Sequence, residues 1–339
     1  NRDVACATCH LPAYGTSDGL SLPIGTGGVG IGPSRQLGVG RNRVPRNAPD
    51  VLLRGSPAFI TMFWDGRVWG APNPGFMSPA GNYLPKGLTD VLAAQAVFPI
   101  TSRDEMRGAV GDLDVKGQPN ELAAFADDDY DSIWEGVVAR LKRIDGYRPL
   151  FAAAYPEVGD TYDIQHVANA IAAFEVQMGN ASASPWDKFL AGDNSALDAD
   201  AVQGALLFYG QAGCSACHSG ALLTDQRYHN LAVPQIGPGK GTLKPLDPGR
   251  AMISGMPEDL FAFRTPPLRN VALTGPWMHN GAYTSLEDVL RQLIRLSELA
   301  RTSRVRQADE ELPKINLTEA DIAPLLAFLS TLNEGLTRE

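Results

Sequence analysis

Cys6-Ala-Thr-Cys9-His10 and Cys214-Ser-Ala-Cys217-His218 are two pentads of the form Cys-x-x-Cys-His, and together they use all four cysteines of the chain. Two thiols at this spacing can form thioethers with both vinyl groups of one haem, and the histidine that follows then faces the iron. We therefore interpret each pentad as an attachment site for a covalently bound c-type haem.

Each pentad has two other interpretations. Half of a zinc ribbon and a thioredoxin-like redox pair both use Cys-x-x-Cys. Two zinc sites would need further ligands, and the chain has no other cysteine and only three other histidines. Two c-type haems are therefore the preferred cofactors, and no cysteine remains for a disulfide.

The composition bounds the size and the partners of the protein. With 339 residues and 44% apolar residues, the chain can bury two cores, which fits one core around each haem. A formal charge of -9 disfavours a nucleic-acid partner. The acidic run Asp127–Asp129 indicates a solvated face or a contact with a basic partner. No apolar stretch is long enough to span a membrane.

Covalent haem also bounds the location. Bacteria attach c-type haem outside the cytoplasmic membrane, so we expect a periplasmic protein. No signal peptide precedes Asn1, and we expect the numbering to begin inside a mature chain whose targeting segment has been removed.

Hydrophobic periodicity predicts helices in the middle and near the end of the chain. Two core-facing stripes have helical spacing: Ile133, Trp134, Val137, Val138 and Leu141, and Val167, Ala170, Ile171 and Phe174. A helix over 198–211 leads into the second pentad. Capping boxes are expected at Thr284-x-x-Glu287 and Thr318-x-x-Asp321.

Strand patterns are scarce, and 11–60 is rich in glycine and proline. We predict a mainly α protein with long loops, few strands and two cytochrome c-like domains, residues 1–180 and 181–339, one around each haem. The final helix could pack back on the first domain.

The loop region contains Gly25-Thr-Gly27-Gly-Val-Gly30, which matches the dinucleotide fingerprint G-x-G-x-x-G. No hydrophobic strand precedes it and no helical pattern follows, so nucleotide binding is disfavoured. Four arginines follow closely and would either neutralise haem propionates or lie on the surface: Arg35, Arg41, Arg43 and Arg46.

Further motifs over most of the chain resemble the bacterial di-haem cytochrome c peroxidase and MauG superfamily. They share its order and spacing: Arg46-Asn47-Ala-Pro49, Phe63-Trp64-Asp65-Gly66-Arg67, Gln95 with Glu105 ten residues later, Thr265-Pro-Pro-Leu-Arg269-Asn270, and Leu273-Thr274-Gly-Pro276-Trp-Met-His279-Asn-Gly281. The resemblance implies that peroxide reacts at the N-terminal haem and that the C-terminal haem transfers electrons.

The resemblance also implies residue roles. His10 and His218 would be the proximal iron ligands. Glu105 would be the distal acid/base with Gln95 as its hydrogen-bonding neighbour, and Trp64 would relay electrons between the haems. His279 would support a haem propionate or the region between the two haems. One calcium ion would be bound by Asn47, Thr274 and Pro276, partly through backbone carbonyls.

The cleavage of peroxide requires the same residue types. Cleavage of a peroxide O–O bond needs one group that takes a proton from the inner oxygen and returns it to the outer one, and a carboxylate in a partly dry pocket can do so. Glu105 is the candidate, although it could be a surface glutamate. Trp64 could equally be a core aromatic residue.

Two positions favour the MauG-like branch within the superfamily. Thr26 stands where peroxidases that need reductive activation usually have a histidine, so we expect an open iron at the first haem. Pro99, four residues after Gln95, also resembles MauG-type enzymes, which use peroxide to oxidise a partner protein, in particular its tryptophan.

The second haem departs from the family pattern. Leu293 occupies the position where the family has a methionine or tyrosine ligand, and leucine cannot ligate iron. Three methionines are alternative candidates, although each is a more ordinary packing residue: Met252, Met256 and Met278.

We therefore expect a peroxide-dependent di-haem oxidoreductase that oxidises a partner protein. One alternative is a di-haem cytochrome c peroxidase that reduces hydrogen peroxide to water with electrons from a small cytochrome or cupredoxin. Another is a non-catalytic di-haem electron carrier, which would have a six-coordinate first haem.

Overall fold

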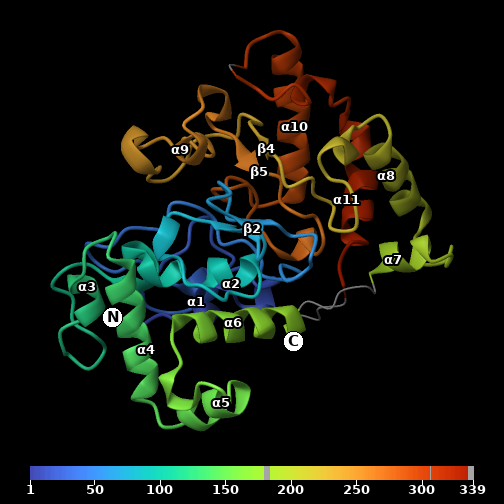
Figure 1. The fold of residues 1–339 in the computed structure, drawn as a ribbon. Helices are drawn as coiled ribbons and strands as arrows, with labels where there is room; N and C mark the ends of the chain where they lie inside the picture. Colours follow the sequence, from blue (N-terminus) through green and yellow to red (C-terminus); the bar gives the residue numbers. More distant parts are fainter. Residues whose placement is uncertain (179–183, 306, 335–339) are drawn as a thin grey trace.

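The computed structural model describes residues 1–178, 184–305 and 307–334 (Figure 1). Helices dominate it, as predicted. Their bounds are α1 Cys6–Cys9, α2 Val91–Ala96, α3 Glu121–Ala124, α4 Tyr130–Lys142, α5 Tyr147–Ala154, α6 Ile164–Met178, α7 Pro185–Leu190, α8 Ala199–Tyr209, α9 Ala251–Ser254, α10 Leu286–Arg301 and α11 Ile322–Ser330. None of the helices in the described ranges is both long and apolar enough to cross a membrane.

The first core lies mainly between α2, α4 and α6, and its buried apolar residues come from 59–172, with Leu222 added from further along the chain. Asp90 and Asp129 cap α2 and α4, because each side chain accepts a backbone N–H three residues later. Trp134 of α4 is buried and donates its indole N–H to the carbonyl of Val97 at 2.9 Å. This bond fixes the turn that follows α2.

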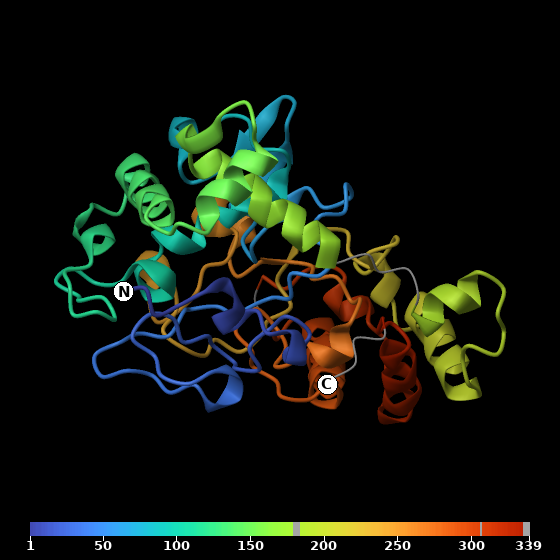
Figure 2. The ribbon, with the colours of Figure 1, turned by 90° about the horizontal axis from the view of Figure 1, so that it is seen from below.

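The second core is formed by residues between 186 and 332. Helices α8 and α11 cross closely at Gly204, where a Cβ would lie 2.7 Å from the Cβ of Phe328 and would meet the backbone carbonyl of Pro324. Both views show the two helices side by side (Figures 1 and 2). Trp186 packs edge-on against Phe328 at 5.1 Å between ring centroids, which closes this core over the helix that leads into the second pentad.

Strands are short, as expected. β1 Thr61–Met62, β2 Val68–Ala71 and β3 Gly75–Met77 form an antiparallel sheet in that order, with Met62 opposite Val68 and Gly70 opposite Phe76. β4 Tyr228–His229 pairs antiparallel with β5 Phe263–Arg264. The backbone N–H of Arg264 donates to the carbonyl of Trp64 at 2.8 Å, so the two halves of the chain meet beside Trp64.

Arginine side chains organise the glycine-rich region. The guanidinium of Arg35 donates to the carbonyls of Ile24, Gly25 and Gly30 at 2.6–2.7 Å. Arg41 pairs with both carboxylate oxygens of Asp112 at 2.7 and 2.9 Å. The long loop is therefore held by arginine side chains rather than by regular secondary structure.

Three local expectations are wrong. Phe174 is 64% exposed, because the buried stripe of α6 ends at Ala172 and the last turns project beyond the first core. Helix α10 begins after Ser285, whose side chain accepts from Asp288 N–H, so the cap lies one residue after Thr284. In the described residues, helix α11 packs mainly on α8 in the second core rather than on the N-terminal half. The capping box at Thr318 is confirmed.

Candidate functional site

Both pentads present their histidine in the same way. The Nδ1 atom of His10 lies 3.0 Å from the carbonyl oxygen of Thr16, and that of His218 lies 3.1 Å from the carbonyl oxygen of Leu223. A carbonyl can only accept, so Nδ1 carries the proton and Nε2 keeps a free lone pair. Histidines that bind metals commonly have this second bond, because it fixes the ring and its tautomer.

The surroundings of the pentads fit covalently bound haem. Burial lowers the pKa of both histidines and so favours the neutral, iron-binding form. All four cysteines have free thiols, and burial raises the pKa of the Cys9 and Cys214 thiols to about 12. Each pentad thus combines two free thiols with one oriented imidazole, which is the donor set that a c-type haem requires.

The residues expected on the peroxide side of the first haem lie on one continuous run of short helical turns. Gln95 lies near the end of α2, Pro99 opens a 3₁₀ turn over Pro99–Thr101, and Glu105 lies in a π-helical turn over Arg103–Arg107. The run packs on α4 through the bond from Trp134 to Val97. π-helical turns are often found at functional sites.

The glycine-rich loop lies directly against this turn. The backbone N–H of Thr26 donates to the carbonyl of Glu105 at 2.9 Å. A Cβ on Gly25 would collide with the backbone carbonyls of Asp104 and Glu105. Gly25 is therefore required for a close approach of two chain segments, which explains the glycine pattern without a nucleotide.

The side chain of Thr26 is engaged in a hydrogen bond and is not available as an iron ligand. Its hydroxyl donates to Asp3 Oδ1 at 2.9 Å, and the N–H of Gly27 donates to Asp3 Oδ2 at 2.6 Å. Thr26 is 4% exposed. The carboxylate of Asp3 thus caps the loop from the segment just before the first pentad, a contact that no local sequence pattern indicates.

Trp64 lies where the halves of the chain meet. Its indole N–H donates to the carbonyl of Asn47 at 3.0 Å, and its own carbonyl accepts from Arg264 of β5. The side chain is half-buried. Trp64 is therefore held to a segment of the first half through its indole and to a strand of the second half through its backbone.

The residues expected to bind calcium come from two segments that touch. The N–H of Asn47 donates to the carbonyl of His279 at 2.8 Å. His279 lies three residues after Pro276 in the chain. The side-chain amide of Asn47 donates to the carbonyl of Leu20 at 3.0 Å. The hydroxyl of Thr274 donates to Val271 at 3.3 Å. Oxygen donors of this kind suit calcium.

His279 is buried and neutral. Its ring stacks on Phe263 with centroids 3.5 Å apart, and burial lowers its pKa to about 3. Its Nε2 atom has no hydrogen-bond partner within the described residues. An orphaned buried nitrogen of this kind fits a contact with a group that the chain itself does not supply, such as a haem propionate.

A buried cluster of charged side chains joins the first and second halves of the chain. The sequence does not indicate that these residues lie together. Arg46 binds Asp65 at 2.5 Å and Asp247 at 2.7 Å. Arg67 and Lys240 approach the same Asp65 carboxylate at 3.0 and 3.7 Å. Burial opposes ionisation of Asp65, but the three cations outweigh it and lower its pKa.

Around the second pentad, Leu293 lies in α10, so the expected ligand position is apolar. Met252 and Met256 are 39% and 48% exposed, which argues against buried iron ligands. Met278 is more enclosed and has a positive φ of 75°. It is the best placed of the three by burial.

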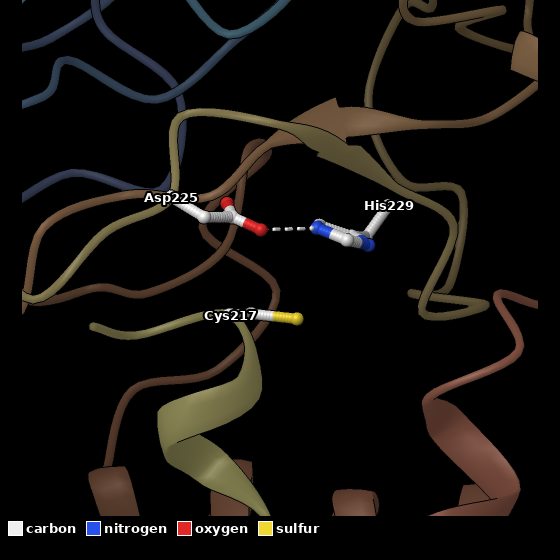
Figure 3. A group of neighbouring side chains, drawn as sticks. All are labelled: Cys217, Asp225 and His229. Atoms are coloured by element: carbon white, nitrogen blue, oxygen red, sulfur yellow. Dashed lines mark hydrogen bonds and ion pairs between the residues drawn. The ribbon is translucent and has the colours of Figure 1, made fainter.

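One cluster near the second pentad resembles a metal site. The ligand atoms of Cys217, Asp225 and His229 lie within 4.8 Å of one another (Figure 3). His229 also binds Asp309 at 2.7 Å and Asp225 at 3.1 Å. Because haem attachment would consume the Cys217 thiol, the cluster is better explained as an imidazolium held between two carboxylates.

Known proteins resemble this chain over most of its length. Residues 1–195 match the sequence model described as di-haem cytochrome c peroxidase. The methylamine utilization protein MauG of Methylorubrum extorquens is 34% identical over 331 residues, which cover 97% of this chain and 72% of that protein. Cytochrome c551 peroxidase of Pseudomonas aeruginosa is 30% identical over 287 residues, 85% of this chain and 65% of that protein.

Among solved structures, a MauG-like protein associated with microbial copper homeostasis has a TM-score of 0.69 and 25% identity. The likeness covers 98% of this chain and 84% of that one. The likeness in fold and the likeness in sequence therefore point to the same group of proteins.

Proposed function

The chain belongs to the di-haem cytochrome c peroxidase family, and we propose that it is a periplasmic enzyme of the MauG-like kind, which uses hydrogen peroxide to oxidise residues of a partner protein, tryptophan in particular. Family membership makes it a peroxide-dependent oxidoreductase with two c-type haems and a redox partner. The kind of partner and the roles of individual residues are the proposed part.

The observation that carries the proposal is the anchoring of Thr26. Its hydroxyl is bound to Asp3 and its N–H to Glu105, so the loop that faces the acid/base residue offers no iron ligand. We infer that peroxide has access to the first site without prior reduction. Pro99 at the start of the following turn supports the same assignment.

Glu105 is the proposed proton carrier. The bound haem supplies the redox chemistry, and the protein must move one proton from the inner to the outer peroxide oxygen. Burial raises the pKa of Glu105, while Arg67 and Lys240 favour its anion. A carboxylate whose pKa is raised in this way is suited to accept a proton and then return it. Gln95 is proposed to orient peroxide through its amide.

Trp64 is the proposed relay between the two haem sites, because it is held by hydrogen bonds to both halves of the chain. The calcium ion is proposed to stabilise the same junction through Asn47, Thr274 and Pro276. Both assignments concern the region where the first and second halves touch.

Steady-state turnover tests the choice of partner. With reduced small cytochrome or cupredoxin as donor, the MauG-like enzyme should consume peroxide slowly and should show no saturation by the carrier. Rapid, saturable turnover would instead support the second candidate, a detoxifying peroxidase, which the 30% identity to cytochrome c551 peroxidase also favours.

A further inference from the structure

We propose that Asp127 is a positioning residue for Glu105. Through Arg103 and Arg107, its carboxylate fixes the π-helical turn that carries the proposed acid/base residue. The inference rests on the proposed function, because it concerns the same proton carrier, and it adds a surface residue to the parts on which that function depends.

Two arginines frame Glu105 in the turn Arg103–Arg107, one two residues before it and one two residues after it. Nε of Arg103 donates to Oδ1 of Asp127 at 2.6 Å, and Nη2 of Arg107 donates to the same oxygen. Bonds between charged groups are stronger than bonds between neutral ones. One carboxylate oxygen therefore ties the first and the last residue of the turn together.

The same guanidinium groups bind backbone carbonyls of the segment that ends and follows α3. Arg103 donates to the carbonyls of Ala123 and Phe125, both at 2.9 Å. Arg107 donates to the carbonyl of Ala126 at 3.0 Å. Both arginines therefore join the turn to this segment, whose next residue is Asp127.

Asp127 holds the arginines from the solvent side. Its side chain is 75% exposed, whereas Arg107 is 1% exposed. A buried guanidinium is costly without a nearby anion. Within the described part of the chain, Asp127 is the carboxylate that pairs with Arg107. We therefore expect the position of Arg107 to depend on the charge of Asp127.

The turn needs such a clamp because its hydrogen-bond pattern is unusual. The N–H of Arg107 donates to the carbonyl of Ser102 at 3.0 Å, and the N–H of Gly108 donates to that of Arg103 at 3.1 Å, so both bonds span five residues. Bonds in an α-helix span four, and one residue corresponds to about 100° around the helix axis. Loss of the π-helical pattern would therefore turn Glu105 away from its present direction.

A second anchor holds the centre of the same turn. The N–H of Thr26 donates to the carbonyl of Glu105 at 2.9 Å, and Gly25 allows this close approach. The glycine-rich loop thus fixes the middle of the turn, while Asp127 fixes its two ends.

The acidic run Asp127–Asp129 is divided between different roles. Asp129 caps α4, because its side chain accepts from the N–H of Ser132 at 3.2 Å. Asp128 is exposed, and its side chain makes no hydrogen bond or ion pair with the residues that the structure describes. Asp128 is therefore a matched control for Asp127.

The test compares Asp127→Asn, which keeps the size of the side chain and removes its charge, with Asp128→Asn. Two rates are measured on the intact di-haem protein: the reaction with peroxide, and the binding of carbon monoxide after reduction, which transfers no proton. We expect D127N to slow the peroxide reaction by about 10–100-fold and to leave carbon monoxide binding unchanged. D128N should change neither rate.

The same substitution in the Glu105→Gln background shows whether Asp127 acts through Glu105. If it does, D127N should slow the double variant no further than E105Q alone. Arg103→Lys cuts the clamp from the other side, because lysine keeps the charge but loses the planar set of donors. Amide hydrogen exchange of residues 107 and 108 should become faster in D127N and in R103K, but not in D128N.

The outcomes separate the two proposals. A D127N variant that reacts with peroxide as fast as the wild type, while E105Q is slow, would overturn the inference alone. So would equal slowing by D127N with and without the Glu105 carboxylate, or slower binding of carbon monoxide, since both indicate a general disturbance of the site. An E105Q variant as fast as the wild type would overturn the proposed function. If D127N does not retain its haems, R103K decides by the same criteria.

Discussion

Thr26 donates its backbone N–H to the carbonyl of Glu105 across 2.9 Å, and this bond joins the glycine-rich loop to the turn that carries the proposed acid/base residue. The approach is possible because residue 25 has no side chain. The same loop is capped by Asp3, so three segments of the first half converge at one point.

A Gly25→Ala substitution should separate this loop from the turn. The added Cβ would collide with two backbone carbonyls, which cannot move as a side-chain end can, so we expect a loss of about 1–3 kcal/mol in the free energy of unfolding. Denaturant unfolding measures the loss. Gly146→Ala is the control, because a Cβ there meets nothing within 4 Å. Equal stability of both variants would refute the close approach.

Asp247→Asn should loosen the junction between the halves. The substitution removes the charge that Arg46 binds through two atoms in a buried place, and breaking such a pair costs about 3 kcal/mol or more. Asp145→Asn, at an exposed position, should have almost no effect. The comparison requires only unfolding curves of the haem-bound proteins; a loss below about 0.5 kcal/mol for D247N would speak against the buried pair.

His229 should make stability depend on pH. Hydrogen bonds to Asp225 and Asp309 raise the pKa of His229, and these two carboxylates remain if Cys217 becomes a thioether. A folded-state pKa above the unfolded value of about 6.5 means that the stabilisation is complete below that pH and declines as the pH rises toward the folded value. The stability difference between wild type and His229→Asn should therefore be larger at about pH 6 than at about pH 9. Parallel pH profiles would contradict this.

Calcium should bind at the junction near Asn47. After chelation, the wild-type protein should take up about one calcium ion per chain in a calorimetric titration, as oxygen-rich sites do. Asn47→Ala should abolish this uptake, while Asn42→Ala, whose side chain binds only Asp104 among the described contacts, should preserve it. Uptake by both variants would place the ion elsewhere.

The sequence predicted the features that depend on local patterns. The two pentads, the stripes in α4 and α6 and the box at Thr318 each lie within a few residues, where spacing alone determines which groups meet. Phe174 shows the limit, because periodicity indicates a face of a helix but not where the covering core ends.

The charge cluster could not be predicted in the same way. Arg46 and Asp247 are 201 positions apart, and Lys240 lies in a glycine-rich loop without periodicity. Only the folded chain brings these residues to Asp65. The sequence motif around Asp65 and the lysine at position 240 were both visible in the sequence. Neither of them indicated that the two side chains would lie together.

EPR and optical spectra of the oxidised protein, recorded before and after one equivalent of hydrogen peroxide and without prior reduction, test most directly whether the first haem site is open. We expect a high-spin iron in the resting protein and an immediate spectral change with peroxide, which Glu105→Gln should slow by about 10²–10⁴-fold, with Glu135→Gln on the exposed face of α4 as the control. Two low-spin irons that do not react with peroxide would contradict the open site.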